Sequence, residues 1–514
     1  MYDFSEITKL IPSSKELDTN FLSPNLGGVL DDYLVLKCRG TPKESLILAL
    51  IVKISQSLML NRVSVTFSET TTPINIYALN FMGSGEGKDK PLKILDSEIM
   101  DTYKNMFNEK MRDYIVKEEK KVLEKADDKY KSGRAEKEKF IEQQKPRQLV
   151  SELSDATLEG FLAMRQAFAT AGFGGTFVKI SEFGDYITSQ NNSRLEFISA
   201  ITEIYDFGDS KPKIIKGERE YSEVNGVPST ILFHTSLSGL LEGNANKQLL
   251  TFLNRGLGRR CFISCPDPLP ASFEGTRELL FQEYKDTITS ANNMITDVKQ
   301  MFSNAIGYTK INNNFRFTEE ADLILFDYKL YNHYRASQRD YYEEDALRAE
   351  LKNRHWKCLK LAGLIAAFEH PKKNEVTTDD LQVAIYITEL FGFHLASFFG
   401  KQEIEGYQKL YGFLKYNLNK WVSKTDIRSQ RFVGKNNFTR WLEENIQFSE
   451  ELASKDGYTL EKEDNGSRGE KYRLVPGQAK QFKELSEATR GMTVGSEEFQ
   501  KARQEILNKY KKDL

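Results

Sequence analysis

The segment at residues 80–91, NFMGSGEGKDKP, contains residue types that can hold a phosphate chain. Its glycines leave backbone N–H groups open to an anion, and Lys88 follows them directly. The usual phosphate-binding loop reads G-x-x-x-x-G-K-[ST], in which the lysine contacts the β- and γ-phosphates and the final hydroxyl binds Mg²⁺. Here Met82 stands at the first glycine position and Asp89 at the hydroxyl position. The segment predicts a nucleotide-binding loop with a carboxylate in place of a hydroxyl.

A second polar group follows an apolar strand predicted over Phe177–Ile180. This strand leads into Ser181 and Glu182, where a site that hydrolyses nucleotides usually has Asp-Glu. In such sites the Asp supports Mg²⁺ and the Glu orients the attacking water. Glu182 is present, whereas Ser181 replaces the acid. Taken alone, the pattern also fits a strand that ends at a surface turn.

A third predicted strand, Ser229–Ser236, ends in the polar residues His234, Thr235 and Ser236. A polar residue on a strand beside the loop strand can sense the γ-phosphate, and we assign this role to Thr235. A helix predicted after this strand leads to three arginines that could act as a finger on a neighbouring subunit's nucleotide: Arg255, Arg259 and Arg260. Each could equally be a solvated or salt-bridged arginine.

The order of these segments resembles that of phage and plasmid replication proteins with a helicase-like P-loop NTPase domain, a RecA/AAA+-like family associated with primase-helicases. The resemblance covers about residues 20–400. It rests on TPKESLILALIVKISQSL, INIYALNFMGSGEGKDKP, FVKISEFGD, NRGLGRRCFI and NRHWKCLKLAGLIAAF, in that order. It implies an α/β fold that binds ATP and Mg²⁺, and a homo-oligomeric ring, such as a hexamer, around single-stranded DNA. A separate primase would be a partner, because we find no primase centre in this chain.

The resemblance also assigns roles to single residues. Glu182 activates the water, Arg260 or its neighbour Arg259 is the finger, and Asp89 holds the metal. The residues assigned to the nucleotide are Gly83, Ser84, Gly85, Gly87, Lys88, Asp89 and Arg354. For Arg354 the alternative is a salt bridge with the acidic run YYEEDALRAE.

Family members usually have Asp-Glu in the second motif, so Ser181 is where this chain departs from them. The departures at Asp89 and Ser181 are complementary, because a hydroxyl became a carboxylate and a carboxylate became a hydroxyl. In the P-loop fold we expect both side chains to approach one Mg²⁺ from adjacent strand ends. The metal would then keep one carboxylate and one hydroxyl ligand, with the carboxylate now from Asp89 and the hydroxyl from Ser181. The alternative is a decayed site, and with it a non-hydrolysing nucleotide- and DNA-binding replication initiator or accessory factor.

Two further segments predict DNA contacts. The segment at 209–228 predicts a basic hairpin that grips single-stranded DNA in a ring channel, or else a solvated turn; its lysines are Lys211, Lys213 and Lys216. Residues 405–476 predict two short helices and a hairpin with Asn-Gly at its tip, which is the order of a winged helix. The residues that could contact duplex DNA there are Lys435, Asn437, Arg440, Arg468 and Lys471. Winged helices also dock proteins, and that alternative stays open.

These segments divide the chain into five predicted parts. They are a helical preface at 1–70, a P-loop NTPase core at 71–315 with a charged helical insertion at 108–148, a helical lid at 316–404, a winged helix at 405–476 and a charged helical tail at 477–514. Lys+Arg 72 against Asp+Glu 74 leaves a net charge of −2, so any DNA-binding surface must be local.

The cysteine pattern and the hydropathy indicate the compartment. Four scattered cysteines are too few for a disulfide framework, and we expect them to be reduced core thiols. No apolar run approaches the roughly 20 residues that span a bilayer, and the N-terminus lacks a signal-peptide pattern. We therefore expect a cytoplasmic protein, in the host cytoplasm if phage-encoded, without a membrane partner.

If Asp89 and Ser181 share one Mg²⁺, either single change, Asp89→Ser or Ser181→Asp, should abolish ATP hydrolysis. The double variant restores the usual pairing and should recover a measurable part of the rate, because residues that share a partner are non-additive. Steady-state ATPase rates of the native chain and the variants check this. An inactive native chain beside an active Ser181→Asp variant would instead identify Ser181 as a lesion.

Overall fold

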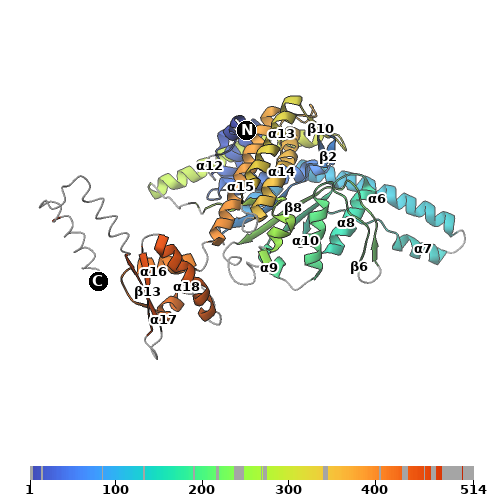
Figure 1. Cartoon of the computed structure of the whole chain (residues 1–514). Helices are drawn as coiled ribbons and strands as arrows, with labels where there is room; N and C mark the ends of the chain where they lie inside the picture. Colours follow the sequence, from blue (N-terminus) through green and yellow to red (C-terminus); the bar gives the residue numbers. More distant parts are fainter. Residues whose placement is uncertain are drawn as a thin grey trace. The chain divides into compact units, whose positions relative to one another are not determined.

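The computed structural model divides the chain into two compact units, Met1–Ser397 and Phe398–Leu514, and we describe each by itself (Figure 1). The structure describes residues 4–12, 16–83, 85–130, 134–188, 192–215, 219–236, 248–249, 251–267, 269, 275–339, 345–403, 407–430, 438–455, 458–464, 470–476 and 501.

A five-stranded parallel sheet lies at the centre of the first unit. Its strands are β3 (Tyr77–Met82), β4 (Leu153–Ser154), β5 (Thr176–Ile180), β8 (Ser229–Ser236) and β9 (Cys261–Ser264). Their spatial order is β4-β5-β8-β3-β9, and every pairing is parallel. All carboxyl ends therefore lie at one edge of the sheet. The strands predicted from apolar runs are confirmed, and β8 has the predicted bounds.

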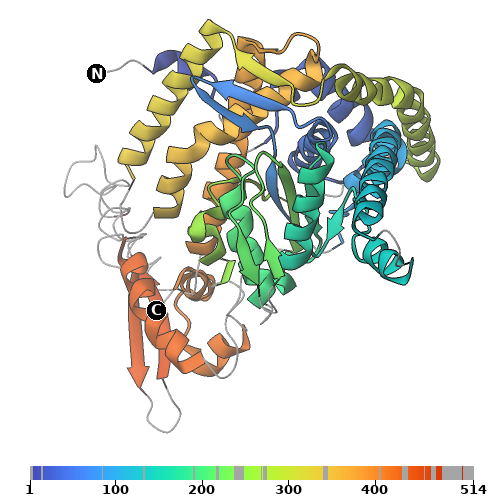
Figure 2. The ribbon, with the colours of Figure 1, turned by 90° about the vertical axis from the view of Figure 1, so that its right-hand side faces the viewer.

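Helices cover both faces of this sheet (Figure 2). On one face lies α4 (Lys43–Met59), where Ser55 Oγ is 2.8 Å from Thr230 Oγ1 on β8. The other face carries α8 (Leu158–Ala171), α9 (Phe183–Thr188) and α10 (Asn192–Ile204), where the ring of Phe183 packs 4.6 Å from that of Phe233. Successive residues of a strand point to opposite faces. Even-numbered residues of β8 thus face α4, and odd-numbered residues face α9.

The predicted preface, core and lid share one hydrophobic core, which extends from Ile7 to Phe391. The helices of this part are α12 (Arg277–Tyr308), α13 (Glu319–Ser337), α14 (Asp345–Glu369) and α15 (Thr378–Glu403). Of these, α13 and α14 pack against a second sheet, whose strand order is β11-β10-β1-β2. Its strands are β1 (Ser64–Phe67), β2 (Thr70–Pro73), β10 (Asn314–Phe317) and β11 (Glu375–Val376). The helix α15 begins at a capping box, in which the side chains of Thr377 and Asp380 each accept a hydrogen bond from the other's backbone N–H.

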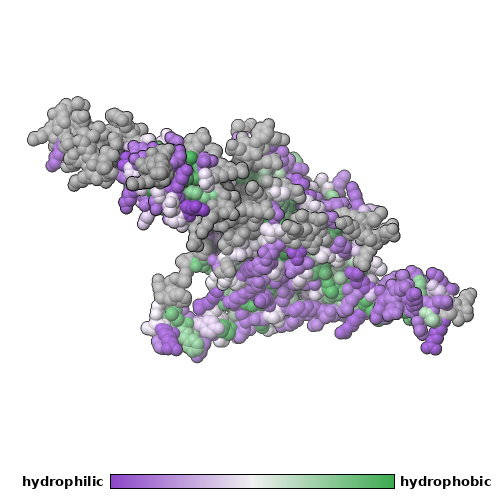
Figure 3. Space-filling model, turned by 90° about the horizontal axis from the view of Figure 1, so that it is seen from below, coloured by the Kyte–Doolittle hydropathy of each residue, from purple (hydrophilic) through white to green (hydrophobic). Residues whose placement is uncertain are grey.

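The charged insertion is helical, as predicted, but it begins earlier and ends sooner. It consists of α6 (Asp101–Lys129) and α7 (Arg134–Gln143), which extend away from the rest of the first unit. Its surface is mostly hydrophilic (Figure 3), although Val116 and Leu123 of α6 are exposed. The remaining elements of this unit are α1 (Ser5–Lys9), η1 (Thr19–Phe21), α2 (Pro24–Gly27), η2 (Gly28–Leu34), α3 (Val35–Lys37), α5 (Lys90–Ile94), η3 (Leu95–Ile99), β6 (Lys213–Ile215), β7 (Arg219–Tyr221) and η4 (Leu253–Leu257).

The second unit has its own small core, which includes Leu414, Ile427, Leu442 and Leu474. Its elements are α16 (Tyr407–Tyr416), β12 (Val422–Ser423), α17 (Lys424–Ser429), α18 (Phe438–Lys455), β13 (Tyr458–Asp464) and β14 (Glu470–Pro476). The three strands form an antiparallel sheet in the order β12-β14-β13. The predicted helices and hairpin are present, whereas the Asn-Gly tip lies outside the described residues.

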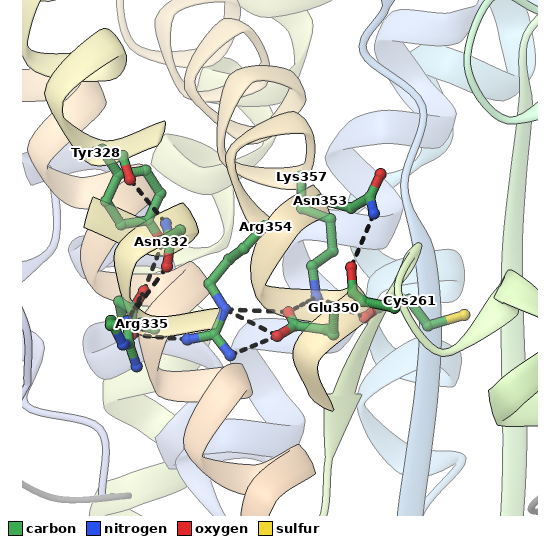
Figure 4. Close-up of polar contacts among 10 residues, drawn as sticks. Cys261, Tyr328, Asn332, Arg335, Glu350, Asn353, Arg354 and Lys357 are labelled. Atoms are coloured by element: carbon green, nitrogen blue, oxygen red, sulfur yellow. Dashed lines mark hydrogen bonds and ion pairs between the residues drawn. The ribbon is translucent and has the colours of Figure 1, made fainter. Parts of the chain in front are cut away.

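A buried ion-pair network joins three helices of the first unit around Arg354 (Figure 4). The guanidinium of Arg354 bonds to Glu350 on its own helix α14, at 2.5 Å, and to Glu389 on α15, at 2.8 Å. Glu389 also accepts hydrogen bonds from Arg335 and from the hydroxyl of Tyr328 on α13. Burial alone would raise the pKa of Glu350, but Arg354 and Lys357 hold it at about 2.

The close fit of this network explains a glycine inside α15. A Cβ placed on Gly392 would lie 2.5 Å from the guanidinium of Arg354, so no larger residue fits there without displacing the arginine.

Replacing Arg354 by leucine should destabilise the first unit by about 3–5 kcal/mol, because two fully buried carboxylates would lose their shared partner. Urea unfolding followed by circular dichroism measures this. Arg335→Leu is the matched control: its side chain is 25% exposed and its loss leaves Glu389 paired with Arg354, so we expect a smaller effect. Equal effects of the two changes would contradict this account.

Candidate functional site

The candidate site lies at the carboxyl edge of the parallel sheet, where the chain changes direction between strands. From β3 the chain crosses to the far strand β4, returns through β5 to β8, and then passes β3 to form β9. Open α/β sheets bind ligands at such a switch point, outside the carboxyl ends of the strands. The segment 83–89 follows β3 at this point, and Glu182 follows β5 at the same edge.

The loop after β3 has a glycine backbone and carries an internal anion. Gly85 and Gly87 adopt positive φ angles of 87° and 75°, which glycine adopts without strain. The N–H of Gly83 donates to the carboxylate of Glu86 at 2.8 Å. A Cβ on Gly83 would lie 2.6 Å from that carboxylate, so a larger residue there would displace the Glu86 side chain. An acceptor therefore already occupies an N–H group that the motif assigns to a phosphate; Ser84 lies outside the described residues.

Lys88 reaches from the loop to the end of β5. Its Nζ donates to Glu182 Oε1 at 2.7 Å and to the backbone carbonyl of Ser181 at 3.3 Å. The Glu182 side chain is 61% exposed, whereas that of Lys88 is 18% exposed. The structure thus brings together the two residues that the sequence assigned to phosphate binding and to water activation.

Asp89 lies beside a lysine that the sequence analysis did not consider. Its Oδ1 is 3.1 Å from Nζ of Lys179 on β5, two residues before Ser181. Burial would raise the pKa of Asp89, but Lys179 holds it below its usual value. A lysine inside an otherwise apolar strand, FVKI, was the signal that could have revealed this pair.

The spacing of the metal residues differs from our expectation. We expected Asp89 and Ser181 at adjacent strand ends, but β8 lies between β3 and β5 and pairs with both. The ion pair of Asp89 with Lys179 therefore passes over the end of β8. The exchange of ligands between Asp89 and Ser181 stays a prediction, now with a strand between the two residues.

At the end of β8, His234 rather than Thr235 faces this ion pair. His234, an even-numbered residue of β8, lies on the α4 face and pairs in register with Asn80 of β3. Thr235 points to the α9 face. His234 is 1% exposed, and neither of its ring nitrogens has a hydrogen-bond partner in the described part of the chain. Burial lowers the pKa of His234 to about 3, so the imidazole is neutral near pH 7.

The candidate arginine fingers lie at the opposite edge of the sheet. Arg259 and Arg260 directly precede β9, at its amino end. Arg260 bonds to Asp206 at 3.1 Å and to the carbonyl of Gly256 at 3.1 Å. Neither arginine is near the loop of its own chain. For Arg255 the structure describes the backbone alone.

Arg354 is placed differently from its predicted role. Its guanidinium is enclosed in the network of Glu350 and Glu389, and its side chain is 4% exposed. Glu350 is the last residue of YYEEDALRAE, so the salt bridge that we held as the alternative is the one that forms. We withdraw the assignment of Arg354 to the nucleotide, because its donors are already used by buried carboxylates.

The predicted DNA contacts are described only in part. The hairpin at 213–221 is confirmed as the antiparallel pair β6 and β7, and Lys211 before it is exposed. Lys213 lies on β6 with its backbone alone described, and Lys216 lies outside the described residues. In the second unit Lys435, Asn437 and Arg468 also lie outside, Arg440 is placed by its backbone on α18, and Lys471 lies on β14 opposite Glu463.

The described residues fit phosphate better than they fit a protein-bound Mg²⁺. Mg²⁺ prefers oxygen ligands at about 2.0–2.1 Å. Asp89, the one carboxylate that the loop directs to β5, already pairs with the ammonium of Lys179. Ser181 adds no negative charge. Among the described residues no group of three or more His, Cys, Asp or Glu side chains could hold a metal ion.

Comparison with models of known protein families finds none that matches this chain, and a search of the curated proteins finds no relative. Among the described helices none is both long and apolar enough to cross a membrane. All four cysteines are buried and none forms a disulfide, as we expected.

Replacing Glu86 by glutamine should tighten ATP binding by about tenfold, because the loop would lose a negative charge that competes for the N–H of Gly83. Isothermal titration calorimetry measures the change. Glu69→Gln, at an exposed position in the β1–β2 turn, removes the same charge and should have no effect. Weaker binding by Glu86→Gln would mean that Glu86 holds the loop in its binding conformation.

Proposed function

We propose that the first unit binds ATP through the loop at 83–89 and hydrolyses it as a helicase-like replication ATPase with a P-loop fold. The observation that carries this proposal is the contact between Lys88 and Glu182, 2.7 Å apart at the ends of two different strands. A cation for the phosphates and a base for the water are both required near the transferred group. This contact supplies both at one point of the sheet edge.

The strand arrangement supports the same proposal. The loop strand β3 and the second-motif strand β5 flank β8, and all three end at the switch-point edge. His234 at the end of β8 can therefore contact the same ligand as Lys88 and Glu182. Nucleotide phosphates carry several negative charges, which the ammonium groups of Lys88 and Lys179 would neutralise.

The opposite edge supports a ring in which subunits complete each other's sites. Arg259 and Arg260 lie at the amino edge of the sheet, away from the loop, so an arginine finger from this pair could act only on a neighbouring copy. The chain that follows the hairpin of β6 and β7 leads into β8 at this same amino edge of the sheet. Single-stranded DNA in a central channel would meet its lysines through phosphate contacts.

We propose a winged-helix fold for the second unit. Its order of helix, strand, two helices and hairpin, with β12 paired to β14, supports this fold. The charges of its helix α18 favour protein docking over DNA reading at that helix. Helix α18 holds four acidic residues and two basic ones, and Glu470 on the wing pairs with both Lys424 and Lys462 at 2.9 Å. DNA phosphates would be repelled by such a helix.

A second candidate function is a nucleotide-binding replication factor that does not hydrolyse. The ion pair of Lys179 with Asp89, together with Ser181, favours this candidate, because both reduce the negative charge available to a metal. The two candidates differ in the role of Glu182 alone. A hydrolysing ATPase requires Glu182 as the base, whereas a factor that only binds the nucleotide does not.

Lys88→Ala should weaken ATP binding by about a hundredfold, because the loop would lose its charged donor to the phosphates. Titration of a fluorescent ATP analogue measures this, with Lys93→Ala on α5 as a solvated control. Equal affinities for the native chain and the Lys88 variant would remove the basis of the proposed function.

Glu182→Gln then separates the two candidates. Under the first it binds ATP and loses hydrolysis that the native chain shows in the presence of single-stranded DNA. A native chain that binds ATP without any turnover would support the second.

A further inference from the structure

Lys179 is an unusual residue for its position. It is the one charged residue of β5, a strand whose other side chains are buried, and its own side chain is 17% exposed. A largely buried ammonium requires an anionic or hydrogen-bonding partner. The partner in the structure is Asp89, which reaches over the end of β8 from the loop.

The contact leaves capacity for a ligand. Oδ1 of Asp89 lies 3.1 Å from the ammonium, yet it makes no aligned hydrogen bond in the described part of the chain. An ammonium has three N–H donors, and among the described residues one carboxylate, that of Asp89, pairs with Lys179. The neutral imidazole of His234, which has no hydrogen-bond partner among the described residues, lies on the same sheet face as this ion pair.

We propose that Lys179 is a tethered cation that takes the place of Mg²⁺, so that this site binds the phosphates of ATP without a divalent metal. The proposal deepens the proposed function and rests on it, because it assumes that the loop binds a nucleotide. It assigns the charge that Mg²⁺ normally supplies to a side chain of the protein itself.

The charges of the site agree with this assignment. Lys88 and Lys179 provide two positive charges, Asp89 and Glu182 provide two negative charges, and each lysine is within 3.1 Å of one carboxylate. An arriving polyphosphate would compete with the carboxylates for both ammonium groups. A Mg²⁺ ion bound by Asp89 would instead lie within a few ångströms of the ammonium of Lys179 and be repelled by it.

His234 favours a phosphate over a metal as the ligand here. A neutral imidazole has one N–H donor, which suits a phosphate oxygen, and Mg²⁺ prefers oxygen ligands to ring nitrogens. The groups that face His234 from the neighbouring elements are Asp89 and Lys88 of the loop and Lys179 of β5. The imidazole thus adds a donor without adding a charge.

The experiment compares ATP affinity in excess EDTA with ATP affinity in millimolar Mg²⁺, using the full chain and calorimetric titration. The native chain should bind ATP in EDTA at least as tightly as in Mg²⁺. Lys179→Met should lose about tenfold in affinity in EDTA and recover it in Mg²⁺, because Asp89 is then open to the metal. Lys179→Arg, which keeps the charge, should stay metal-independent, and Lys93→Met on α5 should behave as the native chain.

Two results would overturn the inference, and they differ from failure of the proposed function. Native chain that binds ATP only with Mg²⁺ would show that Lys179 does not replace the metal, although the nucleotide site would stand. Metal-independent binding unchanged in a folded Lys179→Met variant would have the same meaning. No ATP binding by the native chain in either buffer would refute the proposed function itself. The native comparison needs no variant, so a misfolded variant leaves the test decisive.

Discussion

The candidate site depends on one constraint, the position of β8 between β3 and β5. Parallel pairing on both sides fixes the register of all three strands, so their carboxyl ends lie at one level. Without β8 between them, nothing in the sheet would fix the position of the loop after β3 relative to Glu182 after β5. The buried hydroxyls of Ser55 and Thr230 further tie β8 to helix α4. The sheet thus fixes the spacing over which Lys88 and Asp89 must reach.

Charge in this molecule is compensated locally, both in the core and at the sheet edge. Arg354 lies between two buried carboxylates, and Lys360 is enclosed by hydroxyl, amide and carbonyl oxygens between 2.7 and 3.3 Å. At the sheet edge each lysine again has a carboxylate, but these pairs are partly exposed. A polyanion can compete for the exposed pairs at modest cost, whereas the buried pairs have no such access. Burial therefore separates structural ion pairs from those that can exchange partners.

Much of the fold followed from local patterns in the sequence. Apolar runs predicted β5 and β8, because this signal depends on near neighbours. The order of the strands in the sheet does not depend on near neighbours, because crossover connections of many residues set it. For this reason we wrongly expected Asp89 and Ser181 at the ends of adjacent strands. The same limit hid the partner of Lys179, which lies 90 positions away in the chain and two strands across. Arg354 shows the opposite case: Glu350, one helical turn before it, was visible as a salt-bridge partner.

The loop that joins the hairpin of β6 and β7 to β8 is held firmly at the amino edge. Arg165, which is fully buried, bonds to the carbonyl of Val227 and to the hydroxyl of Ser229, and Ser210 pairs with Val224 through the backbone. From there β8 extends eight residues, roughly 25 Å, to the candidate site. A force applied to the hairpin would therefore be transmitted along β8. It would act as shear on the pairings of β8 with β3 and with β5. The loop after β3 and Glu182 after β5 would then be displaced together, so both sides of the candidate site would be strained at once.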